Sequence, residues 1–286
     1  MEKYYCFAGV ELAVNVCDNR MYEEDRALAP FRVSHAAEPH CFSFEEVREL
    51  SPPEGRHVAS VKDMEVYWTD GERIVYVFTE KGDWKTASMR VRHKEKQHAV
   101  QFRKRAERVQ AKMVLNALAA EHLIAQKHGF VFHCSYIAYN GKAILFTAPS
   151  GTGKTTQAEL WKEYRGARII NGDRAAVRLA DGKLLAEGIP FAGSSQYCKN
   201  RSLPIEAIVY LGQAPETTIR KLRGYEAFSK IWEGVSVDTW DREDMENVSQ
   251  LVQKAAQTIP VYHLPCTPDE SAVIVLEDAL RKQVTP

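Results

Sequence analysis

The sequence lacks the features that would place the chain in a membrane or on nucleic acid. No apolar run approaches the roughly 20 residues needed to cross a bilayer, and Met1–Tyr5 is not a basic segment leading into a long apolar one. The 38 Lys and Arg residues balance 38 Asp and Glu residues, so the net charge is zero. Without a positive excess, neither nucleic acid nor an anionic membrane is an expected partner.

Cysteine is also scarce, and its spacing excludes two further classes of protein. The six cysteines include no C-x-x-C pair, which argues against a zinc site and against a disulfide framework. Reduced thiols are typical of the cytoplasm, which is the expected location. No internal repeat or low-complexity tract is present. What remains is a chain of 286 residues, 45% of them hydrophobic, enough for one or two domains with a full core.

Residues 1–104 are predicted to form a mostly antiparallel, β-rich domain, with substrate or partner binding as a candidate role. Short β-branched and aromatic runs alternate there with turn signals, among them Asp70-Gly71, which is typical of a two-residue hairpin. The predicted strands are Tyr5–Val16, Phe31–Ser34, His40–Phe44, Val58–Trp68, Ile74–Thr79, Ala87–Arg92 and Ala99–Phe102.

Residues 105–286 are predicted to form a second domain of mixed α/β class. Apolar residues recur at helical spacing from Val109 to Ile124, which predicts one helix over 106–128 that ends at Gly129. Strands and helices then mix. The predicted strands are Phe130–Ala138, Lys142–Thr147, Arg168–Ile170, Ala175–Leu179, Ile205–Leu211 and Val261–Leu264, and the predicted helices are Lys154–Tyr164, Tyr225–Glu233, Asp241–Gln257 and a last one opening at Thr267–Glu270.

A basic run lies near the junction of the two predicted domains. Residues 90–108 contain eight Lys and Arg residues against only Glu95 and Glu107. Two interpretations stay open. Positive charge on an edge strand discourages aggregation between sheets, or the run docks an acidic protein or peptide substrate. The first is favoured, because charge runs are usually solvated faces.

Residues Ala148–Thr155 form a P-loop (Walker A motif) between an apolar strand and helix-forming residues, with Ala148 where the motif usually has Gly. Its glycines allow backbone N–H groups to close around phosphate oxygens. Lys154 adds a charge for the β- and γ-phosphates, and Thr155 offers a hydroxyl to Mg²⁺. The sequence therefore predicts a nucleoside triphosphate site, with these binding residues: Pro149, Ser150, Gly151, Thr152, Gly153, Lys154, Thr155 and Thr156.

Two further polar residues are candidates for the same site. Asp173 lies 19 positions after Lys154, at the end of a predicted strand, where its carboxylate can face the phosphates and bind Mg²⁺ or accept a proton. The alternative is a turn Asp in a glycine-containing loop. His133 lies 21 positions before Lys154, on the strand predicted to pair with the P-loop strand. A lone strand histidine is as often structural.

Together these features resemble the C-terminal catalytic domain of HPr kinase/phosphorylase. The string at 150–156 is also similar to ATP-dependent phosphoenolpyruvate carboxykinase, whose nucleotide core is related. The resemblance covers residues 106–286 and is closest to divergent HPr-kinase-related proteins such as lasso-peptide kinases. Beyond the P-loop it rests on residues 188–193, 203–208 and 260–264. It implies an α/β (α+β) fold in which a mixed-sheet P-loop kinase domain follows a smaller β-rich one.

The resemblance also implies roles for individual residues in an enzyme that uses ATP and Mg²⁺. Lys154 would hold the β- and γ-phosphates, and Thr155 would bind Mg²⁺. Asp173 would act as the catalytic base toward a serine hydroxyl, with His133 near the transferred phosphoryl group. The implied acceptor is a hydroxyl-bearing peptide, small protein or small molecule, and a homo-oligomer is a further candidate.

The sequence departs from that family at one position of the site. The family has two adjacent acids where this chain has Gly172-Asp173, so one metal or proton contact is missing or supplied elsewhere. Glu187 is the candidate replacement as a metal ligand, and Arg201 is a candidate cation for the transition state. The segment that serves phosphorolysis in HPr kinases is not found.

The predicted function is therefore ATP-dependent transfer of the γ-phosphoryl group to a serine or other hydroxyl. Two alternatives stay open: a nucleotide-binding regulatory module with little turnover, favoured by the single carboxylate, and an HPr-specific kinase/phosphorylase. A carboxykinase acting on oxaloacetate is disfavoured, because the chain is short and no site for the substrate carboxylates is assembled.

Overall fold

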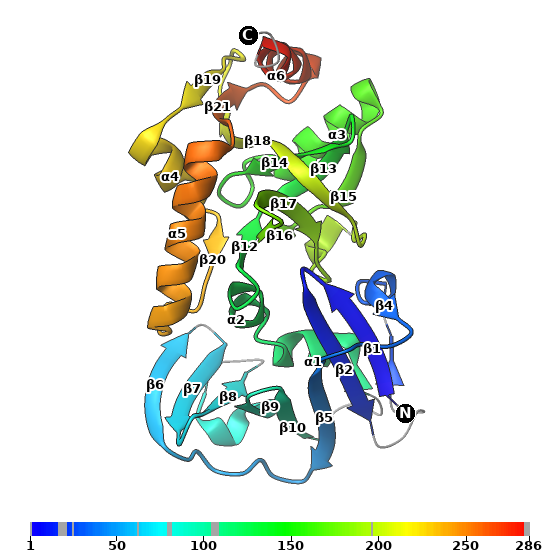
Figure 1. Ribbon diagram of the computed structural model, residues 1–286, viewed down its shortest axis with the longest axis vertical. Coiled ribbons are helices and arrows are strands. Elements are labelled where there is room, and N and C mark those ends of the chain that lie inside the picture. The colour runs from blue at the N-terminus through cyan, green and yellow to red at the C-terminus, as the bar shows by residue number, and fades with distance from the viewer. Residues whose placement is uncertain are drawn as a thin grey trace. The chain divides into compact units, whose positions relative to one another are not determined.

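The computed structural model describes residues 2–16, 22–24, 26–61, 63–78, 82–103, 109–195 and 197–282 (Figure 1). Its contacts divide the chain into two compact units, Met1–Ala119 and Ala120–Pro286, whereas the sequence analysis places the boundary at 104/105. The difference follows from the helix predicted over 106–128, which is wrong as a single element. α1 (Ala111–Ala117) and α2 (Ala120–Ala125) are separate, and Ala119 between them has a left-handed φ of 45°. A right-handed helix cannot continue through such a residue.

The first unit is built on a nine-stranded sheet in the order β4-β1-β2-β5-β10-β9-β8-β7-β6. Most pairings are antiparallel, as predicted, but β5 runs parallel to both β2 and β10. The Asp70-Gly71 hairpin is confirmed, since Thr69 pairs with Glu72. The sheet strands are β1 (Glu2–Phe7), β2 (Val10–Val16), β4 (Arg32–Val33), β5 (His40–Val47), β6 (Arg56–Val61), β7 (Met64–Thr69), β8 (Glu72–Val77), β9 (Met89–Lys94) and β10 (Gln97–Arg103); β3 (Tyr22–Glu23) pairs with β11 (Val109–Gln110).

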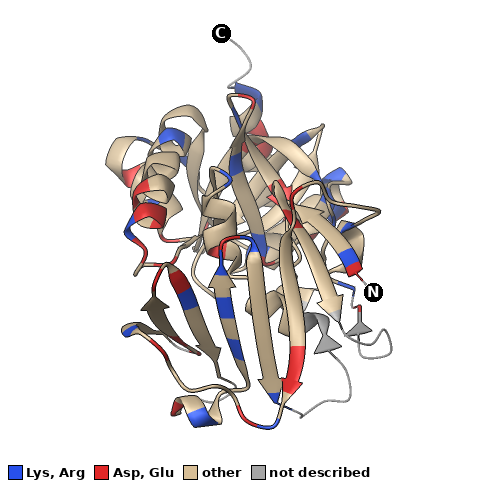
Figure 2. Ribbon diagram, turned by 60° about the horizontal axis from the view of Figure 1, so that its bottom comes forward, with Lys and Arg blue, Asp and Glu red and all other residues tan. Residues whose placement is uncertain are grey.

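Four of the five basic residues in the described part of the basic run are paired with carboxylates of the same unit, and the fifth, Arg103, has a buried Nε atom with no hydrogen-bond partner. Figure 2 marks the basic and acidic residues along the ribbon. Lys94 contacts Glu72 at 3.0 Å and Lys96 contacts Glu38 at 2.6 Å. Arg90 and Arg92 are paired as well, with Glu54 and with Glu54 and Glu72 respectively. These pairs favour a solvated, charge-balanced face over a docking surface for acidic partners. Residues 104–108 of the run lie outside the described residues.

The second unit is a mixed sheet in the order β15-β13-β14-β18-β17-β16-β12-β20, with β21 beside β18 and β19 beside β21. β14, β18 and β21 are parallel, and the other pairings are antiparallel. The strands are β12 (Gly129–His133), β13 (Ser135–Tyr139), β14 (Lys142–Thr147), β15 (Arg168–Asn171), β16 (Arg174–Ala180), β17 (Lys183–Gly188), β18 (Ser202–Gln213), β19 (Arg220–Leu222), β20 (Val235–Ser236) and β21 (Val261–Cys266). The fold is therefore the mixed-sheet α/β class that the sequence predicts.

Helices cover both faces of this sheet, which explains the uninterrupted apolar run in β14. Ala143 and Leu145 join the core beneath α4 (Gly224–Trp232) and α5 (Arg242–Thr258). The alternate residues Ile144 and Phe146 join the opposite core, beneath α3 (Lys154–Arg165) and α6 (Glu270–Lys282). A strand buried on both faces has no polar alternation to show. No described helix is long and apolar enough to cross a membrane.

The topology brings the ends of two strands to one edge of the sheet. β13 runs antiparallel to both β14 and β15, so β14 and β15 point the same way. The P-loop follows β14 and the Asp173 turn follows β15, and both therefore leave the sheet at the same edge. Ligands bind at such an edge in open α/β sheets.

The strand predicted over Phe130–Ala138 is divided at Cys134. His133 ends β12 and pairs with Arg174 of β16, so it is not on the strand beside the P-loop strand. β13 is the neighbour of β14 instead. The chain crosses between the two parts of the sheet at this point, and His133 lies at the crossing.

Gly188 gives a stability prediction for this unit. A Cβ atom on Gly188 would lie 2.0 Å from the carbonyl oxygen of Lys199, which is backbone and cannot move aside cheaply. We expect Gly188→Ala to lower the free energy of unfolding by about 2–4 kcal/mol, measured by urea denaturation. Gly212→Ala is the matched control, since its nearest atom would lie at 3.3 Å on the His263 side chain. Equal losses in the two variants would contradict the steric argument.

Candidate functional site

The P-loop leads into α3 without a side chain that caps the first N–H groups of the helix. Gly153 caps the helix in a left-handed conformation (φ 114°) and offers no side-chain oxygen to the helix N–H groups. Gly151 also has a positive φ of 81°, and a Cβ there would meet no atom within 4 Å. Unoccupied helix N–H groups and the helix dipole favour an anion. The loop therefore fits a phosphate group, and the exposed Thr155 hydroxyl at its rim fits a hydrated Mg²⁺ ion.

Lys154 directs its ammonium group into this loop. The side chain is buried to 8% exposure, and Nζ donates to the carbonyl oxygens of Ala148 (2.9 Å) and Pro149 (3.4 Å). Burial lowers the pKa of Lys154, and the charge of Asp173 opposes that shift. An ammonium has three protons, so these contacts leave one donor for a ligand. A bound phosphate would favour the charged form of Lys154, against the effect of burial.

The turn that carries Asp173 is held by the fully buried Asn171. The Asn171 Oδ1 atom accepts the backbone N–H groups of Asp173 (3.0 Å) and Arg174 (3.1 Å), while Nδ2 donates to the carbonyl of Ile189 (3.0 Å). The Ser135 hydroxyl donates to the Gly172 carbonyl at 3.1 Å. Such an Asx turn fixes the backbone from which the Asp173 side chain leaves.

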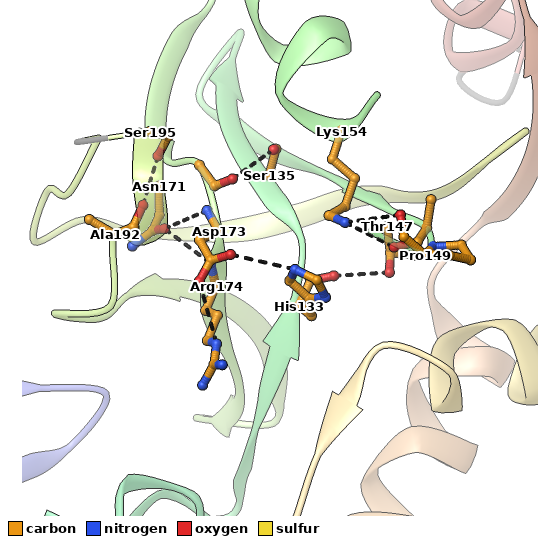
Figure 3. Close-up of polar contacts among 12 residues, drawn as sticks. His133, Ser135, Thr147, Pro149, Lys154, Asn171, Asp173, Arg174, Ala192 and Ser195 are labelled. Carbon is orange, nitrogen blue, oxygen red and sulfur yellow. Dashed lines mark hydrogen bonds and ion pairs between the residues drawn. The ribbon is translucent and has the colours of Figure 1, made fainter. Parts of the chain in front are cut away.

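The Asp173 carboxylate lies among three cationic or hydrogen-bonding groups. Its Oδ1 atom is 3.5 Å from Nε2 of His133, and its Oδ2 atom is 3.5 Å from Nε of Arg174. The contact with His133 is the main cause of a lowered pKa for Asp173, and Arg174 and Lys154 add to it against the effect of burial. Figure 3 shows His133 between Asp173 and the P-loop residues, with its carbonyl accepting the Thr147 hydroxyl at 3.0 Å.

Two glycines pack closely around this turn, one against Asp173 and one against Ser195. Gly193 has a positive φ of 57°, and a Cβ there would lie 2.7 Å from Cγ of Asp173. A Cβ on Gly172 would lie 2.1 Å from Oγ of Ser195. A second acid at position 172, which the HPr kinase resemblance implies, would therefore require Ser195 to move, and the Ser195 hydroxyl donates to the carbonyl of Ala192.

The buried amide of Asn171 carries a prediction about positioning. Asn171→Ala leaves the N–H groups of Asp173 and Arg174 without their acceptor, and each buried orphan costs about 1–3 kcal/mol. We expect a lower kcat for any reaction that uses Asp173, with little change in the Kd for ATP measured by calorimetry. Ser135→Ala, which removes one hydrogen bond from the same turn, should affect kcat less. A change in Kd without a change in kcat would contradict this role.

The structure does not bring every predicted residue to the P-loop edge. Glu187 is 7% exposed, and its carboxylate makes two hydrogen bonds with Arg178 (2.6 and 3.0 Å) and accepts one from the Ser202 hydroxyl (3.1 Å). These three hydrogen bonds favour a structural role for Glu187 over the role of metal ligand predicted for it. Arg201 is exposed and lines a separate hollow with Tyr139 and Asn140, at the opposite end of β14 from the P-loop.

Sequence reasoning missed the residues that position the carboxylate. Asn171, Arg174 and Gly193 were given no role, although the Asn-Gly-Asp order at 171–173 is the signal for an Asx turn. Nothing in the sequence relates Gly193 to Asp173, because the two meet only through the fold. The remaining P-loop residues Pro149, Ser150, Thr152 and Thr156 lie in the loop and first helical turn, as predicted from the motif.

Three comparisons place the chain among known proteins. The family model described as "SynChlorMet cassette protein ScmC" matches residues 100–271, more than half of the chain. None of the curated proteins matches. Among solved structures, the HPr(Ser) kinase/phosphatase from Coxiella burnetii is 11% identical, and the match covers 54% of this chain and 89% of that one at a TM-score of 0.33. A likeness that low carries no argument about fold or activity.

Proposed function

The chain belongs to the SynChlorMet cassette protein ScmC family, and we propose that its second unit is an ATP-dependent kinase. The proposed reaction transfers the γ-phosphoryl group to a serine or other hydroxyl of a peptide, small protein or small molecule. The observation that carries the proposal is the meeting of Asp173 and His133 at 3.5 Å, on the sheet edge where the P-loop presents Lys154. These groups come from three separate segments of the chain.

The proposed roles follow from the position of each group. The backbone N–H groups of the P-loop and the Lys154 ammonium hold the phosphates of ATP, which neutralises charge on the leaving diphosphate. The Asp173 carboxylate orients the acceptor hydroxyl and takes its proton as the new O–P bond forms and the bond to the β-phosphate oxygen breaks. The contact with His133, at 3.5 Å between Nε2 and Oδ1, lowers the pKa of Asp173 and so favours its ionised form. Catalysis of this kind is mainly positioning and charge neutralisation.

We propose that Thr155, whose side chain is exposed at the rim of the P-loop, and Asp173 would hold a magnesium ion. Mg²⁺ bound there would neutralise charge on the β- and γ-phosphates. Glu187 is not among the proposed ligands, because Arg178 and Ser202 occupy its carboxylate.

Mass spectrometry after incubation with ATP and Mg²⁺ tests the proposal. A hydroxyl-bearing acceptor should gain the mass of one phosphate, and the label from γ-³²P-ATP should move to it. Because the family description names a cassette, we propose peptides and small proteins encoded beside the chain as the first acceptors to try. HPr is the comparison acceptor for the alternative of an HPr-specific kinase/phosphorylase.

A second candidate is a nucleotide-binding regulatory module with little turnover. The observation that favours it is the single carboxylate, since position 172 holds Gly and a side chain there would clash with Ser195 as it is placed. ATP binding by calorimetry, with neither hydrolysis nor transfer to any acceptor, would support the module and overturn the kinase.

A further inference from the structure

A hollow of about 510 Å³ lies on the second unit, away from the P-loop edge. It is formed by the turn between β13 and β14, the end of α3, the start of β15 and the segment that leads into β18. The P-loop lies at the other end of the same strand β14 and the same helix α3 (Figure 1). A 12-residue helix is about 18 Å long, so the two places are well separated.

Cationic side chains gather around this hollow. Arg165, Arg168, Lys199 and Arg201 line it, and no Asp or Glu does. Arg165 is engaged with Glu277 at 2.9 Å and with Glu270 at 3.4 Å. The other three are exposed, and none of them forms an ion pair within the described residues. Among the described residues, no carboxylate is therefore paired with Arg168, Lys199 or Arg201.

Several other Lys and Arg residues of the same unit form ion pairs with carboxylates, whereas Lys127, Lys183 and Lys254 form none within the described residues. Lys142 contacts Glu206, Arg178 contacts Glu187 and Lys230 contacts Glu233. Three unmatched cations around one concave site repel one another unless an anion lies between them. An arginine guanidinium can also donate two parallel hydrogen bonds to two oxygens of one phosphate group, which a lysine ammonium does not.

We propose that this hollow is a second anion site, which binds a small molecule carrying phosphate groups. Its volume falls within the range of small-molecule pockets, about 300–1,000 Å³. Arg168, Lys199 and Arg201 supply the charge, and the backbone turn at Asn140-Gly141 borders the site. The ligand is either a second copy of the nucleotide or a phosphorylated compound without a base; the shared chemistry is the phosphate group. This proposal does not depend on the kinase proposal.

Calorimetry with inorganic pyrophosphate on the full-length chain tests the site. Lys154→Ala is used as the parent, so that binding at the P-loop is reduced. Adding Arg168→Gln, Lys199→Gln and Arg201→Gln together should weaken pyrophosphate binding at least tenfold. The control removes the same charge elsewhere on the second unit, by Lys127→Gln, Lys183→Gln and Lys254→Gln, and should bind like the parent. Circular dichroism and the Tm check that each variant folds.

The outcomes of this titration separate the interpretations. Binding within twofold of the parent in the Arg168, Lys199 and Arg201 variant would overturn the proposal, as would an equal loss in the control. Titration of the parent with ATP then distinguishes the ligands: ATP binding that this variant loses indicates the nucleotide, and binding of pyrophosphate alone indicates a compound without a base. If the variant does not fold, pyrophosphate is titrated into the parent and followed by NMR. The chemical-shift changes should then map to residues 139–141 and 199–201, and changes confined to other residues would overturn the site.

Discussion

Lys154→Ala is expected to reduce phosphoryl transfer about a thousandfold, which corresponds to about 4 kcal/mol of transition-state stabilisation. The Lys154 ammonium is buried and already directed into the P-loop by the carbonyls of Ala148 and Pro149. It needs no reorganisation to meet a phosphate, and burial strengthens its interaction with developing negative charge. The initial rate of transfer from γ-³²P-ATP is the measurement.

Nucleotide binding provides a second readout of the same substitution. A ligand that binds only the folded state raises the Tm in proportion to RT ln(1 + [L]/Kd). ATP should therefore raise the Tm of the wild-type chain and raise that of Lys154→Ala much less. Lys162→Ala, on the same helix but exposed and paired with Glu159, is the control and should behave as wild type. An unchanged transfer rate in Lys154→Ala would exclude this P-loop as the site of reaction.

Asp173→Asn is expected to lower the transfer rate by about 10²–10⁴-fold while the Kd for ATP stays close to that of the wild type. Asparagine has nearly the same shape but cannot take a proton from the acceptor hydroxyl. Asp181→Asn is the control, because Asp181 is an exposed turn residue whose positive φ (48°) asparagine also tolerates. Transfer at the wild-type rate in Asp173→Asn would contradict the role of Asp173 as the base.

The pH dependence of the transfer rates of the wild type and Asp173→Asn follows from the lowered pKa of Asp173. Its folded pKa lies below the ordinary value of 3.8, chiefly because of His133, so the carboxylate is ionised throughout pH 6–9. The ratio of the wild-type rate to the Asp173→Asn rate should therefore stay constant over that range. A ratio that falls as the pH is lowered toward 6 would mean that Asp173 becomes protonated there, in conflict with its observed surroundings.

The parts of the site that the sequence predicts are those that depend on local order. The P-loop is one contiguous motif, and its strand and helix follow from the apolar run and the helix-forming residues beside it. Asp173 is predictable because a residue at the end of β15 must reach the edge where β14 ends. The sequence also indicates His133, but places it on the strand next to β14, whereas it ends β12 and pairs with Arg174.

The parts that the sequence does not predict depend on distant contacts or on a single backbone residue. Ala119 divides the predicted helix with one positive φ, and alanine gives no signal of that conformation. Glu187 and Arg201 have plausible chemistry for the site, but Glu187 is paired with Arg178 across a hairpin and Arg201 faces another hollow. Periodicity and spacing describe neighbours along the chain, so they cannot reveal such pairings.

The close packing of Gly172 against Ser195 restricts how this protein can change over evolutionary time. An acid at position 172 would meet Ser195 at 2.1 Å with its first carbon atom, so that substitution alone carries a steric penalty. A mutational path toward paired acids is therefore expected to include a change at position 195, to glycine, or a displacement of its loop. The two positions are expected to covary among relatives, because of volume rather than charge.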